Sequence, residues 1–234
     1  GNLNDISLRA LQILKNVSLI ACEDTRQTKK LMNKFEIKNN TLSFNEHNAS
    51  SKIPIIINKL KLGNSIALVS DAGMPSICDP GENLVREVRS NNIDVICIPG
   101  PCAATTALVA SGLPSSSFIF KGFLPRKKIE REKVLFEISN HEKTIILFES
   151  PNRVLKLMMD LKKYCGGERE IRVFRELTKK YEEQIGDNIN MVLNSFENRK
   201  ILGEITIVIK GINKKEKLKF DKLLLKKELN ELID

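Results

Sequence analysis

The sequence predicts an α/β protein, because short apolar runs of strand length alternate with amphipathic helical segments along most of its 234 residues. Such alternation is typical of helices packed on largely parallel sheets. The stretch GLPSSSFIF, residues 112–120, interrupts the alternation, and the density of charged residues rises after it. We therefore expect two α/β domains, residues 1–116 and residues 117–234.

The apolar runs and helical patterns place the individual elements. The expected strands are residues 17–22, 41–44, 65–70, 93–98, 118–122, 144–149, 171–175 and 204–209. The expected helices are residues 8–15, 52–62, 81–90, 103–111, 130–139, 152–163 and 188–196. A Lys/Leu/Glu-rich pattern over residues 214–232 predicts a further helix, which we interpret as a solvated surface or capping helix.

The composition excludes several classes of protein. Hydrophobic residues make up 41% and charged residues 29%, as in a globular protein, and no apolar run approaches the ~18 residues of a membrane span. Five cysteines without a CxxC pair predict buried free thiols and a reducing, cytoplasmic location. Only two histidines are present, which excludes a His-rich metal site, and we expect no metal.

The positive charge lies mainly in the second half of the chain. Residues 1–120 hold 12 basic and 10 acidic side chains, whereas residues 121–234 hold 26 and 19. This surplus favours an anionic partner, nucleic acid first, although a solvated excess of lysine without any partner explains it as well. Aromatic residues are only 5%, which argues against a stacking platform for single-stranded nucleic acid.

Four loops that follow expected strands carry ligand-binding residue types. They are EDTRQT (23–28), SDAGMPSICDPG (70–81), PGPCAA (99–104) and ESPNR (149–153). Loops at the carboxyl ends of parallel strands converge on one crevice. Asp71 would repel phosphates but tolerate a ligand with positive charge, so a sulfonium fits this loop better than ATP does. The small residues around 100–104 allow close approach of a ligand, or equally tight packing of helix on sheet.

Polar residues next to these loops are candidates for catalysis. Glu23, Asp24 and Arg26 follow a strand directly, and they form either a polar pocket wall or a local ion pair of little energetic value. His47 in FNEHN is more typical of a hydrogen-bonded structural histidine than of a base. The charged run that begins at Arg175 and Glu176 is typical of a solvated surface.

Taken together, the loops resemble a known family. GNLNDISLRAL, IACEDTRQTKKL, FNEHN, LVSDAGMPSICDPG, PGPCAATTALVASGLP, FKGFLPRKK, LFESPNRV, FRELTKKYEE and GEITIVI follow one another in a characteristic order. In this respect the chain, from residue 1 to about residue 210, resembles the small-subunit ribosomal RNA methyltransferases among the tetrapyrrole-methylase-like, class III enzymes. The resemblance implies two α/β domains with S-adenosylmethionine in the cleft between them, usually as a homodimer. It also implies 2′-O-methylation of a cytidine in the decoding region of small-subunit (16S) rRNA, with the assembled subunit as the usual substrate.

The resemblance also assigns residues to the cofactor. Gly73, Met74, Pro75 and Ile77 would line it through backbone and apolar contacts, with Asp71 either touching it or organising the loop. The remaining residues implied to contact the cofactor are Ala103, Ala104, Phe148, Glu149, Glu204 and Ile205. In this family an apolar strand precedes the GNL motif, and the first domain here is therefore expected to be one strand short.

For the reaction, removal of the proton from a ribose hydroxyl requires a base at the cleft. Glu23 or Asp24 is preferred, with Arg26 orienting the RNA, while Glu46, His47 and Glu149 stay open as alternatives. The expected phosphate contacts are Arg126, Lys127, Lys128, Arg153, Arg175 and Lys179. Two other functions stay open, a methyltransferase of this fold acting on a small molecule and a non-catalytic RNA-binding or ribosome-assembly protein.

Overall fold

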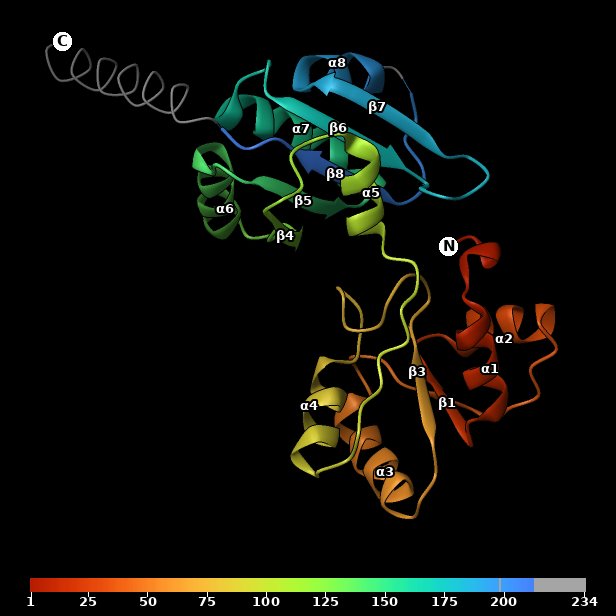
Figure 1. The fold of residues 1–234 in the computed structure, drawn as a ribbon. Helices are drawn as coiled ribbons and strands as arrows, with labels where there is room; N and C mark the ends of the chain where they lie inside the picture. Colours follow the sequence, from red (N-terminus) through yellow and green to blue (C-terminus); the bar gives the residue numbers. More distant parts are fainter. Residues whose placement is uncertain (198, 213–234) are drawn as a thin grey trace, which may run out of the picture. The chain divides into compact units, whose positions relative to one another are not determined.

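The computed structural model describes residues 1–197 and 199–212, and Figure 1 shows their fold. The helix predicted over residues 214–232 lies outside the described residues. The chain forms two compact units, Gly1–Cys102 and Ala103–Asp234. This division comes earlier in the chain than the expected one at residue 116, because helix α5 (Ala103–Ser111) packs on strands of the second unit.

The first unit is built on a parallel three-stranded sheet. Its strands are β1 (Leu19–Cys22), β2 (Thr41–Ser43) and β3 (Ile66–Val69), in the order β2-β1-β3. Ile20 in the central strand lies opposite Thr41 on one side and Ala67 on the other. Because β1 is paired along both edges and covered on both faces, Ile20, Ala21 and Cys22 are fully buried.

Two helices cover each face of this sheet. A short 3₁₀ turn (Leu3–Asp5) leads into α1 (Leu8–Asn16), and α1 and α2 (Thr25–Lys34) bury Leu14 and Met32 against one face. On the other face α3 (Ala49–Lys61) and α4 (Glu82–Ser90) bury Ile56, Leu84 and Val88. Since alternate strand residues point to opposite faces, Ile20 joins the first core and Ala21 the second.

The second unit contains a mixed five-stranded sheet. Its strands are β4 (Phe118–Phe123), β5 (Thr144–Glu149), β6 (Glu170–Arg175), β7 (Glu183–Asn188) and β8 (Ile205–Ile209), in the order β4-β5-β8-β6-β7. Among the described strands of this sheet, β4 and β5 are the only neighbours that pair in parallel, while β8 pairs antiparallel with both β5 and β6. The expectation of largely parallel sheets is wrong for this unit, because a short connection turns β7 back on β6 as a hairpin.

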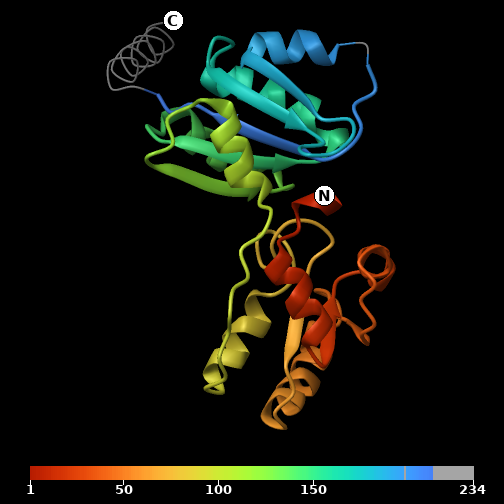
Figure 2. The same ribbon diagram turned by 45° about the vertical axis from the view of Figure 1, so that its right-hand side comes forward.

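Helices also cover both faces of the second sheet. On one face α6 (Lys128–Asn140), α7 (Pro151–Cys165) and α8 (Ile189–Phe196) enclose the largest core of the described residues, which includes Leu147 and Ile207. On the other face α5 packs on β8 and β5, as Figures 1 and 2 show. Ala104, Ala107 and Leu108 are buried there, and their small size suits a close approach of helix to sheet.

Three elements differ from the sequence-based expectations. Residues 93–98 are not a strand in the structure, and Ile96 and Cys97 are exposed. In the described part of the chain β3 pairs with β1 alone, so its other edge carries no strand. Helix α2 was not expected because its residues are mostly polar, and β7 was not expected because EQIGDN lacks an apolar alternation.

Candidate active site

Acidic side chains gather at the carboxyl edge of the first sheet. Glu23 and Asp24 follow β1, Glu46 follows β2, and Asp71 follows β3. Two hydrogen bonds join the loops directly. The Asp24 N–H donates to Asp71 Oδ1 at 3.2 Å, and the Asp71 N–H donates to Glu23 Oε2 at 3.4 Å. The convergence predicted for loops 23–28 and 70–81 is therefore what the structure shows.

Asp24 and Arg26 form a local structure at the start of α2. The Asp24 carboxylate caps the helix by accepting a hydrogen bond from the Arg26 N–H at 2.8 Å, and it holds the Arg26 guanidinium at 2.7 Å. Hydrogen bonds from the Arg26 side chain and backbone lower the pKa of Asp24 to about 2. A carboxylate with so low a pKa is a weak base, and its hydrogen bonds assign it to shaping the loop.

The pKa of Glu23 is shifted in the opposite direction to that of Asp24. Desolvation by burial raises its pKa, the Asp71 N–H lowers it by donating a hydrogen bond, and the negative charges of Asp71, Glu46 and Asp24 raise it again. Within residues 1–197 and 199–212, no lysine or arginine pairs with Glu23. A carboxylate that is repelled by its neighbours and lacks a cation can take up a proton at higher pH, as a general base must.

The glycine-containing loop after β3 lies against the loop at residues 99–102. Gly73 has a φ of +76°, which favours glycine, and a Cβ added there would lie 3.7 Å from the carbonyl oxygen of Pro101. The Ser70 hydroxyl donates to the Ala72 carbonyl oxygen at 3.2 Å. Ser76 and Cys78 also have positive φ angles, so the backbone of this loop is strained, as is often seen at binding sites. Met74 and Pro75 are half-buried in it, and Ile77 is exposed.

His47 lies in the turn after β2, and it is held there by a hydrogen bond from its backbone. Its N–H donates to the Asn45 side-chain oxygen at 3.1 Å, and Asn45 and Asn48 exchange further hydrogen bonds across this turn. The turn exposes Glu46 close enough to Glu23 to raise its pKa. The loops after all three strands of the first sheet therefore contribute to one acidic edge.

In the second unit, the residues expected at the cofactor differ in what they can offer a ligand. Ala103 and Glu204 are exposed, and Phe148 is half-buried against Phe120 and Phe123. Ala104, Glu149 and Ile205 are buried, at 4%, 2% and 2% exposure. For Ile205 only the backbone can reach a ligand, because its side chain points into the core.

The six expected phosphate-binding cations fall into two groups. Arg126, Lys127 and Lys128 are exposed, the first two between β4 and α6 and Lys128 at the start of α6. The other three pair with carboxylates, Arg153 with Glu149 at 3.2 Å, Arg175 with Glu183 at 2.8 Å and Lys179 with Glu204 at 2.9 Å. A phosphate would have to compete with these carboxylates, so the loop between β4 and α6 is the more available anion site.

Comparison with known proteins identifies the family. Residues 1–190 match the Tetrapyrrole (Corrin/Porphyrin) Methylases. Ribosomal RNA small subunit methyltransferase I of Thermotoga maritima is 46% identical over 90% of this chain and 94% of its own length. The protein of the same name from Synechocystis is 40% identical over 100% of this chain and 84% of its own. The chain belongs to this family. It is accordingly a methyltransferase that uses S-adenosylmethionine.

Solved structures confirm the fold of the methyltransferase. Cobalt precorrin-4 methyltransferase, a cobalamin biosynthetic enzyme, superposes with a TM-score of 0.67 at 15% identity over 90% of both chains. Diphthine synthase superposes with a TM-score of 0.65 at 12% identity over 89% of this chain and 86% of its own. At these identities the likeness establishes the tetrapyrrole methylase fold predicted from the sequence.

The acidic edge of the first unit suits the cofactor of this family. When bound, S-adenosylmethionine supplies an electrophilic methyl group on a positively charged sulfonium sulfur. The carboxylates of Glu23, Glu46 and Asp71 would attract that charge. Around Gly73 and Pro101 the loops come together with small or cyclic residues, which leave the backbone open to a ligand.

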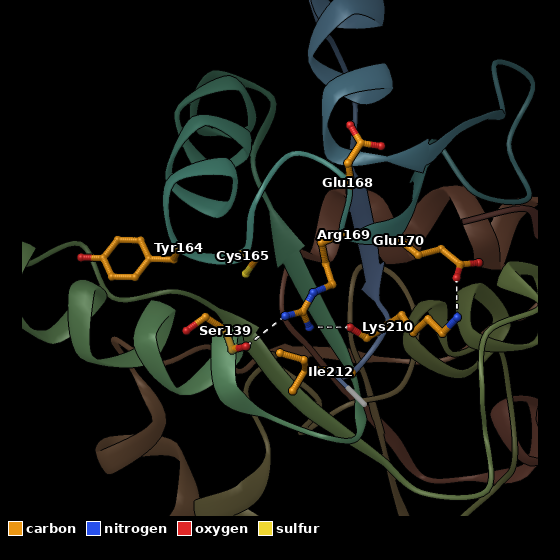
Figure 3. A pocket seen from close by; sticks show the side chains of 9 residues that line it. Ser139, Tyr164, Cys165, Glu168, Arg169, Glu170, Lys210 and Ile212 are labelled. Atoms are coloured by element: carbon orange, nitrogen blue, oxygen red, sulfur yellow. Dashed lines mark hydrogen bonds and ion pairs between the residues drawn. The ribbon is translucent and has the colours of Figure 1, made fainter. Parts of the chain in front are cut away.

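A separate pocket of the methyltransferase lies in the second unit, at the end of the sheet where β5 and β6 begin. It has a volume of about 340 Å³, and Figure 3 shows its lining. Arg169 donates to the carbonyl oxygens of Ser139 at 3.0 Å and Lys210 at 3.1 Å, and Lys210 pairs with Glu170 at 2.7 Å. Its polar groups thus largely satisfy one another, and none of the residues expected at the active site lines it.

In the part of the chain that the structure describes, no helix is long and apolar enough to cross a membrane. Among the same residues, no group of three or more His, Cys, Asp or Glu side chains is arranged to hold a metal ion.

Proposed function

We propose that this methyltransferase modifies the ribose 2′-hydroxyl of a cytidine in the decoding region of small-subunit rRNA, with Glu23 as the general base. The observation that carries the proposal is the state of Glu23, a half-buried carboxylate with a raised pKa and no cation paired to it in the described residues. The names of the relatives, at 46% and 40% identity, support the choice of small-subunit rRNA as substrate.

The proposed reaction balances as a single displacement. The ribose oxygen forms a bond to the methyl carbon while the carbon–sulfur bond breaks. The electron pair of the broken bond stays on sulfur, which becomes a neutral thioether. The hydroxyl proton passes to a Glu23 carboxylate oxygen, which contributes about 10²–10⁴-fold to the rate for a well-placed base. Asp24 and Asp71 hold the loop around Glu23 through their hydrogen bonds and act as positioning residues.

RNA binding in this proposal relies on the exposed loop that follows β4 and on the first residue of α6. Arg126, Lys127 and Lys128 would contact phosphates, which gives affinity that depends on salt but carries little sequence information. Sequence selection would come from the shape of the RNA and from a splayed nucleotide, because side chains cannot enter the major groove of A-form RNA. We propose that the enzyme acts in the cytoplasm as a homodimer, and sedimentation equilibrium would measure its oligomeric state.

The test is methylation of unmodified small ribosomal subunits by the purified protein with S-adenosylmethionine, followed by mass-spectrometric mapping of the rRNA. We expect one new 2′-O-methylcytidine in the decoding region, and naked rRNA serves as the comparison substrate. Methylation of a base, or of no nucleotide in a preparation that binds the cofactor, would refute the proposal. Turnover of a small-molecule acceptor alone would instead support the other methyltransferase activity.

A further inference from the structure

A buried carboxylate lies at the carboxyl end of β5 in the second unit. The side chain of Glu149 is 0% exposed, and its Oε1 accepts a hydrogen bond from the Ser150 N–H at 2.8 Å. Its Oε2 lies 3.2 Å from Arg153 Nη2 and 3.9 Å from Arg131 Nη1, yet it has no hydrogen bond of good geometry. Burial on this scale prevents direct contact of the carboxylate with RNA or with a ligand at the surface.

The two arginines connect Glu149 to the basic loop that follows β4. Arg153 Nη2 also donates to the carbonyl oxygen of Leu124 at 2.9 Å, immediately after β4. Arg131 lies in the first turn of α6, where its N–H donates to the carbonyl oxygen of Lys127 at 2.9 Å and its Nε to Asp160 at 2.9 Å. Glu149 therefore acts on both ends of residues 124–131.

Between these two anchors lie the three exposed cations Arg126, Lys127 and Lys128. Among the described residues their one ion pair joins Lys127 to Glu130 at 3.4 Å, an exposed pair that restrains the loop little. The buried network thus restrains both ends of the backbone that carries them. A loop held in its binding conformation loses less entropy when it binds, so the restraint favours binding of a polyanion.

Burying a carboxylate with two arginines is a poor way to gain stability, because desolvation offsets most of the attraction. Apolar residues of similar size would serve the core at least as well. The network therefore calls for another explanation, and its reach to both ends of the basic loop offers one.

We propose that Glu149 is a positioning residue for RNA binding, which acts through Arg153 and Arg131 on the loop of Arg126, Lys127 and Lys128. This inference rests on the proposed function, because it takes RNA as the polyanion. It differs from the contact with the cofactor that the family resemblance implies for Glu149, since a carboxylate with 0% exposure restrains its neighbours instead of touching a ligand.

The deciding variant is Glu149→Gln in the full chain, because charge and positioning predict opposite results. The substitution removes one negative charge, which by itself would strengthen binding to RNA. Loss of the restraint should instead raise the Kd for small ribosomal subunits about tenfold, equivalent to about 1.4 kcal/mol, and leave the Kd for S-adenosylmethionine unchanged. In turnover we expect the KM for subunits to rise while kcat is unchanged, a split that a loss of folded protein would not produce.

The matched control is Glu137→Gln, which removes the same charge from an exposed ion pair of α6 with Lys121. It should bind subunits as tightly as the unchanged chain or more tightly. If Glu149→Gln does so too, or if it weakens cofactor binding as much as subunit binding, the inference is wrong.

A second variant covers the case in which Glu149→Gln does not fold. Arg153→Lys keeps the charge but cannot span both the Glu149 carboxylate and the Leu124 carbonyl as the guanidinium does, so it should also raise the Kd for subunits. If the unchanged chain itself shows no affinity for small subunits, the proposed function fails and the inference fails with it. If the unchanged chain binds and both variants bind equally well, only the inference fails.

Discussion

Glu23 and Glu149 occupy equivalent places in the two units, at or just after the carboxyl end of a strand in a sheet covered by helices on both faces, yet their surroundings are opposite. Glu23 is half-buried among three other carboxylates, without a paired cation in the described chain. Glu149 is buried between two arginines. The difference shows that the neighbouring charges decide what a carboxylate can do. Repulsion by other carboxylates favours uptake of a proton, whereas burial between two arginines favours a structural anion that stays ionised.

The largest effect that would test this contrast is expected for Glu23→Gln. An amide cannot accept the ribose proton as a base does, so single-turnover methylation should fall by about 10²–10⁴-fold. The Kd for S-adenosylmethionine, measured by calorimetry, should change little. Glu46→Gln is the matched control, since it removes a charge from the same edge and should retain most of the rate. A full rate in Glu23→Gln would exclude Glu23 as the base.

Glu149→Ala should show its effect in stability. It removes the carboxylate from the half-buried Arg153 and leaves the buried Arg131 with Asp160 alone. Breaking a buried pair costs about 3–5 kcal/mol in the free energy of unfolding, and the loss here should lie near the lower end of that range, because Arg131 keeps one partner. Urea unfolding followed by circular dichroism measures the loss. Glu137→Ala, at an exposed pair, should cost less than about 1 kcal/mol. Equal losses for the two variants would contradict the contrast between buried and exposed pairs.

A smaller effect is expected in the pH dependence of Asp71→Asn. The negative charge of Asp71 is one of the causes that raise the pKa of Glu23, so the substitution should lower that pKa. A base works only when deprotonated, and the acidic limb of the kcat/KM profile should therefore move to lower pH. Asp94→Asn, in the same unit but outside the acidic edge, should leave the limb in place. A shift to higher pH would show that Asp71 does not repel Glu23.

The smallest effect is expected for Asp24→Asn, which keeps a capping side chain on α2 but removes its charge. The pKa of Asp24 is lowered to about 2 in the fold, so its charge contributes stability above the unfolded value of about 3.8. That contribution is lost as pH falls through about 2. The thermal midpoint of the unchanged chain should be the higher one at pH 7, and the two midpoints should converge below pH 2. A difference that persists well below pH 2 would have another cause.

Much of the fold could be predicted because local pattern and burial agree. Ile145, Ile146 and Leu147 form a continuous apolar run that is buried on both faces, and β5 begins and ends where the sequence predicts. The acidic edge was also predictable, since Glu23 and Asp71 each follow a parallel strand. Residues 93–98 have an equally apolar pattern but form no strand, because strand formation depends on pairing across the sheet, which the pattern of one segment does not determine.

The sequence by itself determined the α/β class, the order of most helices and strands, the family resemblance and the residues that follow each strand of the first sheet. Only the tertiary structure decided which carboxylates have cations as partners. Asp24 is two residues from Arg26 and pairs with it locally, whereas Glu149 at the end of β5 meets Arg131 of α6 only because α6 packs on the sheet that contains β5. Electrostatic roles depend on distances through space and on burial, and neither can be read from spacing along the chain.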